Sequence, residues 1–265
     1  MKKSNTQPDA LHDTQASPDF RNLRIDKVGV KGLRYPIVVR DRAHATQNTV
    51  ATVTLAVDLP HQFKGTHMSR FVEVLQKHGG LIHVESIPDI LRALQERLQA
   101  DSAHVELDFP YFIEKKAPVT GAAGLVDYQT RFDATLHGKD LRFKVAITVP
   151  VTTLCPCSKA ISERGAHNQR GHVRLEVTFG KTVWIEDLVS LVESCASSEI
   201  FSLLKRPDEK HVTERAYDNP VFVEDLVRAV SVQCDAHPDI QWYRVEAENF
   251  ESIHNHSAYA MIERG

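Results

Sequence analysis

The chain has 265 residues, of which 42% are hydrophobic and 25% are charged, and its formal net charge is −3. This composition is ordinary for a globular protein, and the length allows one large domain or two modest ones. The small negative charge gives no electrostatic footprint for nucleic acid, so that class of partner is disfavoured. No apolar run approaches the length of a membrane span, so we expect no membrane association.

The N-terminus and the cysteines indicate where the protein works. Lys2 and Lys3 are not followed by an apolar segment, so we expect no signal peptide. Four cysteines in a chain of this length do not suggest a disulfide framework. Both features favour a reducing, cytoplasmic setting. Residues 1–22 are mostly polar and show no periodicity, which predicts a disordered N-terminal arm.

The first half of the chain alternates between the periods of strands and helices. The predicted elements, in chain order, are strands 25–39 and 53–59, helices 68–75 and 90–98, and strands 105–109 and 128–136. Gly32 predicts a turn or bulge within the first strand. Gly79 and Gly80 end the first helix. Ser86 is a candidate cap for the second helix, with Pro88 in its first turn.

The second half repeats this order. Its predicted elements are strands 143–151 and 173–179, helices 188–195 and 223–234, and strands 243–247 and 257–262. Asn219 and Pro220 are interpreted as the cap and the first residue of the last helix. The segments 206–214 and 248–256 are polar and without a strong period, so both are interpreted as loops.

The repeated order favours an α+β fold made of two ββααββ modules, residues 23–138 and 139–265, with antiparallel sheets and helices on one face. Such a sheet has open edges, which are a hazard unless they are paired. Pairing them between subunits would close a barrel, so we expect a homo-oligomer. The second module carries the Cys- and His-rich segments, so we expect most of the active site there.

The segment Thr153–His172 offers the clearest candidates for chemistry. Free cysteine is often a small buried hydrophobe, but a Cys-Pro-Cys sequence beside a polar, His-bearing loop is harder to explain by packing. Thiol and imidazole groups on a loop between strands suit a metal site at a sheet edge, which makes Cys155 and His167 the first candidate ligands. Cys157 could be a second ligand, a nucleophile or a packed thiol. The candidates for a further ligand are Asp208, Glu209, Glu251 and His254.

Four blocks of the sequence resemble the GTP cyclohydrolases of type IB. They are CPCSKAISERGAHNQRGH at 155–172, GTHMSRF at 65–71, RPDE at 206–209 and NPVFVEDLVR at 219–228. The resemblance extends from about Leu23 to the C-terminus. It implies the tunnelling fold, with two ββααββ modules, and a homotetramer with active sites at subunit interfaces. The implied reaction converts GTP and water to formate and 7,8-dihydroneopterin triphosphate, the first step of tetrahydrofolate biosynthesis.

The resemblance also implies roles for individual residues. It implies one divalent ion per subunit, zinc, manganese or iron, held by Cys155, His167 and Glu209 with Glu251 close by. The implied catalytic residues are Cys155, His167, Glu251 and His254. The implied contact with the purine of GTP is Glu224. The triphosphate also needs cations, and among the Lys and Arg residues near these blocks we select Lys159, Arg170 and Arg70 as the candidates.

Two other functions fit the residues less well. A thiol-nucleophile enzyme acting on a deazapurine nitrile would use a cysteine covalently and would leave His167 and Glu209 without a role. A non-catalytic zinc- or purine-binding module would bind its ligand without turnover. Metal-dependent formation of formate and a pterin distinguishes the cyclohydrolase from both.

Overall fold

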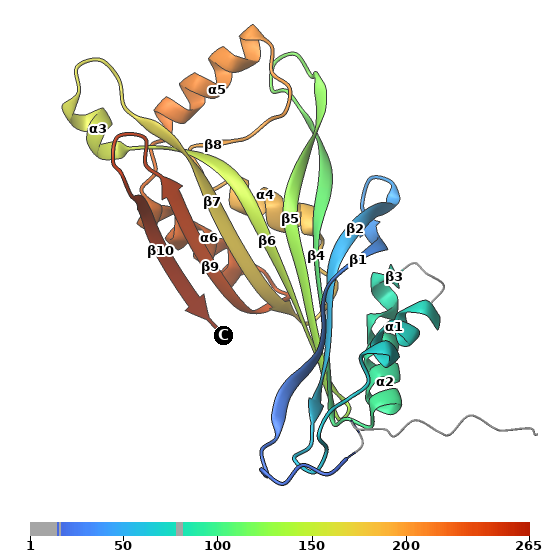
Figure 1. The fold of residues 1–265 in the computed structure, drawn as a ribbon. Coiled ribbons are helices and arrows are strands. Elements are labelled where there is room, and N and C mark those ends of the chain that lie inside the picture. The colour runs from blue at the N-terminus through green and yellow to red at the C-terminus, as the bar shows by residue number, and fades with distance from the viewer. Residues whose placement is uncertain (1–14, 16, 78–81) are drawn as a thin grey trace, which may run out of the picture.

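The computed structural model describes residues 15, 17–77 and 82–265, which form one large sheet with helices beside it (Figure 1). The strands are β1 (Ile25–Asp41), β2 (Ala45–Leu59), β3 (Ile82–His83), β4 (Ser102–Lys116), β5 (Ala123–His137), β6 (Asp140–Leu154), β7 (Asn168–Phe179), β8 (Ser198–Glu199), β9 (Ile240–Phe250) and β10 (Ser257–Arg264). The helices are α1 (Met68–Lys77), the short 3₁₀ helix η1 (Val84–Ser86), α2 (Ile87–Leu98), α3 (Pro156–Ile161), α4 (Ile185–Glu193), α5 (Arg206–Asp218) and α6 (Val223–Ala236).

The strands follow the order β10-β9-β7-β6-β5-β4-β2-β1-β3, and β8 pairs with β6. Neighbouring strands are antiparallel except for the short β1–β3 pair. The predicted modules share this one sheet, because β5 pairs directly with β6, as in the register of Ala134 with Phe143. The α+β class and the first six elements are confirmed. The second half departs from the prediction, because it contains α3 and α5 as well.

One face of the sheet carries a continuous apolar core. Leu55, Val105 and Ala134 lie on neighbouring strands, share this face by their pairing, and are at most 1% exposed. The helices α1, α2, α4 and α6 contribute their apolar residues to the same core. Burying a side chain such as Leu91 or Leu226, both fully buried, contributes about 1.5–3 kcal/mol relative to exposing it. The helical stripes thus hold these four helices on one face.

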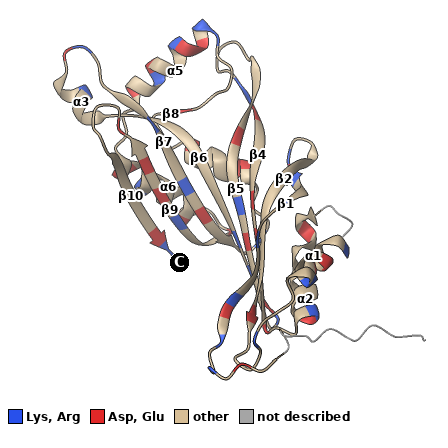
Figure 2. Ribbon diagram, in the orientation of Figure 1, with Lys and Arg blue, Asp and Glu red and all other residues tan. Residues whose placement is uncertain are grey.

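The opposite face is formed by the exposed and half-buried residues that alternate with the buried ones along the strands. Figure 2 shows charged residues of both signs along β4, β5, β7 and β9. Arg131 of β5 pairs with Glu106 of β4, and Arg174 pairs with Glu176 on β7 at 2.6 Å. Ion pairs on an exposed face contribute little to stability, typically about 0–1 kcal/mol each. The ion pairs of this face therefore add little to the stability that the apolar core provides.

Several local predictions are confirmed. Gly32 has a φ of 82°, and the register with β2 shifts between Val30 and Leu33, so the predicted bulge is present. Pro88 lies in the first turn of α2, and Ser86 is its N-cap residue. The Ser86 hydroxyl makes no capping bond, however, and instead donates to the carbonyl of His83 at 2.6 Å. The predicted helix end at 79–80 lies outside the described residues.

The prediction around residue 219 was wrong. Asn219 ends α5 as its C-cap, and α6 begins later, with Phe222 as its N-cap residue. The segment that was interpreted as a polar loop, beginning at Arg206, is the helix α5. Only Asp208 and Ala216 of this fully described helix are buried, so the helix needs no apolar stripe and its sequence shows none. Hydrophobic periodicity therefore gave no signal for it.

The predicted disordered arm spans residues 1–22, of which 1–14 and 16 lie outside the described part. In the remainder, Pro18 forms a bridge with Phe63, and the amide of Lys64 donates to the carbonyl of Ser17 at 3.1 Å. This part of the arm is therefore bonded to the loop before α1. Among the described helices, none is long and apolar enough to cross a membrane.

Candidate active site

A pocket at the α3 end of the sheet gathers most of the predicted site residues. Its volume is about 250 Å³. The residues of the pocket that can carry chemistry are Cys155, Cys157, His167, Glu224, Glu251, His254 and His256. They come from the β6–β7 connection, the start of α6, and the loop between β9 and β10, so the fold brings together three segments that are far apart in the sequence.

The helix α3 positions the two thiols. Cys155 follows β6 as the N-cap residue of α3, and its Sγ accepts a hydrogen bond from the amide of Ser158 at 3.4 Å. Pro156 takes the first helical position, where a missing N–H does no harm. The Cys157 side chain is exposed. This short helix was predicted as loop, and six residues are too few to show an apolar stripe.

Strand pairing brings His167 to Cys155. The amide of Cys155 donates to the carbonyl of His167 at 3.1 Å, just beyond the last paired residues of β6 and β7. His167 Nδ1 lies 3.0 Å from Gln169 Oε1 and 3.9 Å from Glu251 Oε2. Gln169 is held in turn by its own hydrogen bond to Thr153. With Nδ1 engaged by these oxygens, Nε2 is the ring nitrogen available to bind a ligand.

The two carboxylates of the RPDE segment have different environments. The Asp208 carboxylate is buried and accepts hydrogen bonds from the amides of Val119, Thr120 and Lys205 and from the Thr120 hydroxyl. Burial acts to raise the pKa of Asp208, but these hydrogen bonds outweigh it and hold the pKa well below its usual value. Its lone pairs are taken, so Asp208 is no candidate ligand. Glu209, the next residue, is exposed on α5.

The structure thus brings three of the four predicted metal ligands, Cys155, His167 and Glu251, to one pocket, whereas Glu209 does not line it. Thiolate, imidazole and carboxylate donors suit a divalent transition ion. Within the described residues, however, no group of three His, Cys, Asp or Glu side chains is arranged to hold an ion. The donor types fit a metal, and the arrangement in one chain does not complete a site. The ligand set stays a prediction.

Glu224 and the C-terminal histidines form the rest of the pocket. Glu224 lies in the first turn of α6, where the helix dipole favours a carboxylate. The rings of His254 and His256 stack with their centroids 5.2 Å apart. His256 was not assigned a role from the sequence, since a single histidine on a polar segment carries no specific signal. Its place beside His254 is visible only in the structure.

The cations predicted to bind the triphosphate do not converge on this pocket. Lys159 donates to the carbonyl of Tyr217 and lies over its ring, 4.3 Å from the centroid. Arg170 is exposed on β7, and Arg70 belongs to α1. In the described part of the chain, these three side chains lie outside the pocket. Their role in binding phosphate stays a prediction.

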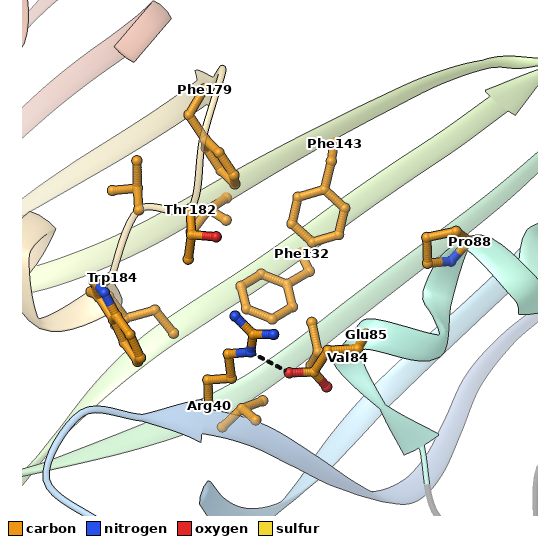
Figure 3. Close-up of a pocket in the computed structure, with 13 residues that line it drawn as sticks. Arg40, Val84, Glu85, Pro88, Phe132, Phe143, Phe179, Thr182 and Trp184 are labelled. Atoms are coloured by element: carbon orange, nitrogen blue, oxygen red, sulfur yellow. Dashed lines mark hydrogen bonds and ion pairs between the residues drawn. The ribbon is translucent and has the colours of Figure 1, made fainter. Parts of the chain in front are cut away.

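A second cavity, of about 400 Å³, is lined by residues of β1, α2, β5, β6 and β7 and of the segments beside them (Figure 3). Its walls include the rings of Phe132, Phe143, Phe179 and Trp184. Its charged groups are Arg40 and Glu85, which pair with each other at 2.6 Å. Among the described residues of its lining there is neither a thiol nor an imidazole, so it is a poorer candidate for catalysis than the smaller pocket at α3.

Solved structures with the same fold include two urate oxidases. Uricase from Arthrobacter globiformis superposes with a TM-score of 0.50 at 11% identity, covering 90% of this chain and 93% of that chain. Urate oxidase from Bacillus sp. TB-90 gives a TM-score of 0.54 at 8% identity, covering 91% and 99%. At these identities the likeness concerns the fold alone, and it agrees with the predicted tunnelling fold.

Sequence relatives are far closer. The chain is 62% identical over 257 residues to a GTP cyclohydrolase FolE2 of Akkermansia muciniphila, covering 96% of this chain and 97% of the relative. The proteins of the same name from Magnetococcus marinus and Nitrosomonas eutropha are 57% and 54% identical, covering 96% and 100% of this chain, and 96% and 98% of the relatives. The family model of type I GTP cyclohydrolase folE2 matches residues 11–260, so the resemblance starts before Leu23, where it was predicted to begin. The chain belongs to the type I GTP cyclohydrolase FolE2 family.

Proposed function

We propose that this protein converts GTP and water to formate and 7,8-dihydroneopterin triphosphate, the step that opens tetrahydrofolate biosynthesis. The observation that carries the proposal is the pocket at α3. It combines thiol, imidazole and carboxylate groups with a carboxylate at a helix N-terminus, in a chain whose relatives across almost its full length are named GTP cyclohydrolase FolE2.

Glu224 is the proposed guanine anchor. An ionised carboxylate accepts two parallel hydrogen bonds, which matches the adjacent N1–H and 2-amino donors of guanine. Glu224 lines the pocket from the first turn of α6, and Phe222 and Val223 beside it add apolar surface. Adenine has no such pair of donors on this edge, so Glu224 selects guanine over adenine.

The chemistry at C8 of the purine needs activated water and proton transfer. Cys155, His167 and Glu251 are the pocket residues that would hold a divalent ion, with Glu209 of α5 as the further ligand that the family resemblance implies. A divalent ion, when bound, supplies Lewis-acid chemistry that activates water near neutral pH. Zinc, manganese and iron all suit this donor set.

Two pocket residues are proposed to move protons. An imidazole both donates and accepts protons near neutral pH, so His254 can protonate the purine ring nitrogen and make C8 a better electrophile. Glu251 can accept protons during ring opening and the loss of formate. The ring of His256 stacks on His254 and helps to fix the orientation of its ring.

The proposed active enzyme is a homotetramer with its sites at subunit interfaces. Within the described residues, the strand β10 pairs with β9 alone, and one edge of β1 is open apart from its short pairing with β3. Unpaired edges invite pairing with another chain, and closing them between subunits would form a barrel. Lys159, Arg170 and Arg70 could then reach a neighbour's pocket and bind the triphosphate. A monomer in light scattering would contradict this. A cytoplasmic location stays a prediction.

The function is tested by incubating GTP with protein treated with chelator, and with the same protein after zinc, manganese or iron is restored. We expect formate and a fluorescent pterin only in the metal-loaded samples, and no product from ATP. The absence of product in every divalent metal refutes the proposal. GTP binding without turnover would instead support a non-catalytic module, and metal-independent covalent attack by a cysteine on a deazapurine nitrile would support the thiol-nucleophile enzyme.

A further inference from the structure

The helix α5 is held by polar contacts rather than by apolar packing. All of its residues are described, and it buries only Asp208 and Ala216. A helix without an apolar stripe gains little from hydrophobic burial, so its hydrogen bonds and ion pairs decide where it lies. α5 lies at the same end of the sheet as α3 (Figure 1).

Asp208 attaches the first turn of α5 to the first module. Its Oδ1 accepts from the amides of Val119 and Thr120, both at 2.9 Å, in the hairpin that joins β4 to β5. Its Oδ2 accepts from the Thr120 hydroxyl at 2.7 Å and from the amide of Lys205 at 2.9 Å. An ionised carboxylate offers about four acceptor positions, and here they are all used. The carboxylate therefore joins the helix N-terminus to the hairpin tip.

The other end of α5 contacts α3 and leads into the segment that forms one wall of the pocket. Lys159, from the helix that carries Cys157, donates to the carbonyl of Tyr217 and lies over its ring. Three residues after α5 ends, the amide of Val221 donates to the carbonyl of Leu154 at 3.1 Å. Val221 is the first residue of the pocket wall that residues 221–224 form. α5 thus connects the β4–β5 hairpin to α3 and to this wall.

We propose that Asp208 is a positioning residue for GTP binding. It holds the N-terminus of α5 on the β4–β5 hairpin, and the helix in turn sets the place of the wall that carries Glu224. The inference rests on the proposed function for the role of Glu224. Cys155 and His167 are held by the pairing of β6 with β7 rather than by α5. Loosening α5 should therefore leave these two residues in place, weaken the binding of GTP, and lower kcat through Glu209, the proposed further ligand, which follows Asp208 on α5.

The test compares Asp208→Asn with Asp89→Asn. The chain offers this matched control because Asp89 follows Pro88 in the first turn of α2, as Asp208 follows Pro207 in α5, but Asp89 is exposed and pairs only with Arg92 among the contacts described. In Asp208→Asn one carboxylate oxygen is replaced by an NH₂ group. This group cannot accept a hydrogen bond from the amide of Lys205 or from the amides of the hairpin, so at least one hydrogen bond is lost. We expect KM for GTP to rise about tenfold, kcat to fall as Glu209 moves with the helix, and the α5 amides to exchange hydrogen about tenfold faster. Asp89→Asn should change none of these.

Two substitutions of Thr120 provide the rescue test. Thr120→Val removes the hydroxyl that donates to Asp208, and it should raise KM and α5 exchange in the same direction by a smaller factor. Thr120→Ser keeps the hydroxyl and should restore both towards wild type. Unchanged α5 exchange in Asp208→Asn would overturn the anchor. Faster exchange with unchanged KM would overturn its link to the site. Failure of the proposed function is distinct, because the wild-type chain would then turn over no GTP, while hydrogen exchange still tests the anchor.

Discussion

Lys115 is the central cation of a buried charge cluster, and its removal tests how much this buried ion pairing contributes to the free energy of unfolding. Its Nζ lies 2.8 Å from Glu193 Oε1 and 2.5 Å from Glu199 Oε2. The side chains of Lys115 and Glu193 are each 10% exposed, and that of Glu199 is 24% exposed. The Tyr128 hydroxyl also donates to Glu193 at 2.8 Å. Lys115→Met keeps the aliphatic part of the side chain but leaves two carboxylates close together without this cation.

The expected loss in the free energy of unfolding follows from these contacts. Removing one partner of a buried ion pair typically costs about 3–5 kcal/mol. Arg215 still pairs with Glu199 at 3.1 Å, and Glu193 can take up a proton, so the lower end applies. We expect Lys115→Met to lose about 3 kcal/mol at pH 8. The cation–π contact of Lys115 with Phe201, at 4.6 Å, contributes up to about 1 kcal/mol of this.

The loss should depend on pH. Burial raises the pKa of Glu193 above its ordinary 4.5, against the opposing effects of Lys115 and Tyr128. Without Lys115 that pKa rises further, so the folded variant holds its proton to higher pH than the unfolded chain does. Stability then falls as pH rises through the raised pKa, by about 1.4 kcal/mol for each unit of added shift. Burial acts to raise the pKa of Glu199, but Lys115 and Arg215 together lower it below its ordinary 4.5. The lowered pKa stabilises the folded wild type above pH 4.5, and the part of this stability that Lys115 provides is lost in the variant. Both effects make the penalty larger at pH 8 than at pH 5.

The assay is equilibrium unfolding in urea at pH 5 and pH 8, at one fixed protein concentration because oligomerisation contributes to apparent stability. Lys210→Met is the matched control. Lys210 pairs with Glu214 on the surface, where the two side chains are 73% and 60% exposed, and its loss should cost less than about 0.5 kcal/mol. The reasoning is refuted if Lys115→Met costs no more than Lys210→Met at pH 8, or if its penalty is larger at pH 5.

Three further predictions concern the site and the sheet. Cys155→Ala should abolish GTP turnover and lower zinc affinity by more than about a hundredfold, and full metal occupancy in elemental analysis would show that the ligand set is wrong. Glu224→Ala should weaken GTP binding by about a hundredfold in calorimetry with metal content unchanged, and equal affinity would remove it as the guanine anchor. Gly29→Ala should cost about 3 kcal/mol in urea unfolding, because its Cβ would lie 1.9 Å from the carbonyl oxygen of Leu55; wild-type stability would contradict the close approach of β1 and β2.

Alternating apolar residues were sufficient to predict most of the strands. β2, β4, β5, β6, β7 and β9 each bury one face, and that burial has a period of two in the sequence. The stripes of α1, α2, α4 and α6 were found for the same reason, since each of these helices packs an apolar face on the sheet. The Cys155–His167 segment was found by its residue types, and strand pairing explains why its two ends meet.

The tertiary structure decided the features that have no hydrophobic period in the sequence, namely the helix α5 and the grouping of the pocket residues. α5 is held by Asp208 and Arg215 through partners more than fifteen positions away in the sequence, so no pattern of neighbouring residues revealed it. The same holds for the meeting of Glu224 and Glu251 with Cys155, and for the separation of Glu209 from that pocket. The sequence by itself determined most of the strands, the four packed helices and the family, because burial and residue type produce local patterns, whereas the order of the strands in one sheet was seen only in the structure. The geometry of the site depends on polar contacts between distant segments, and these form only when the chain is folded.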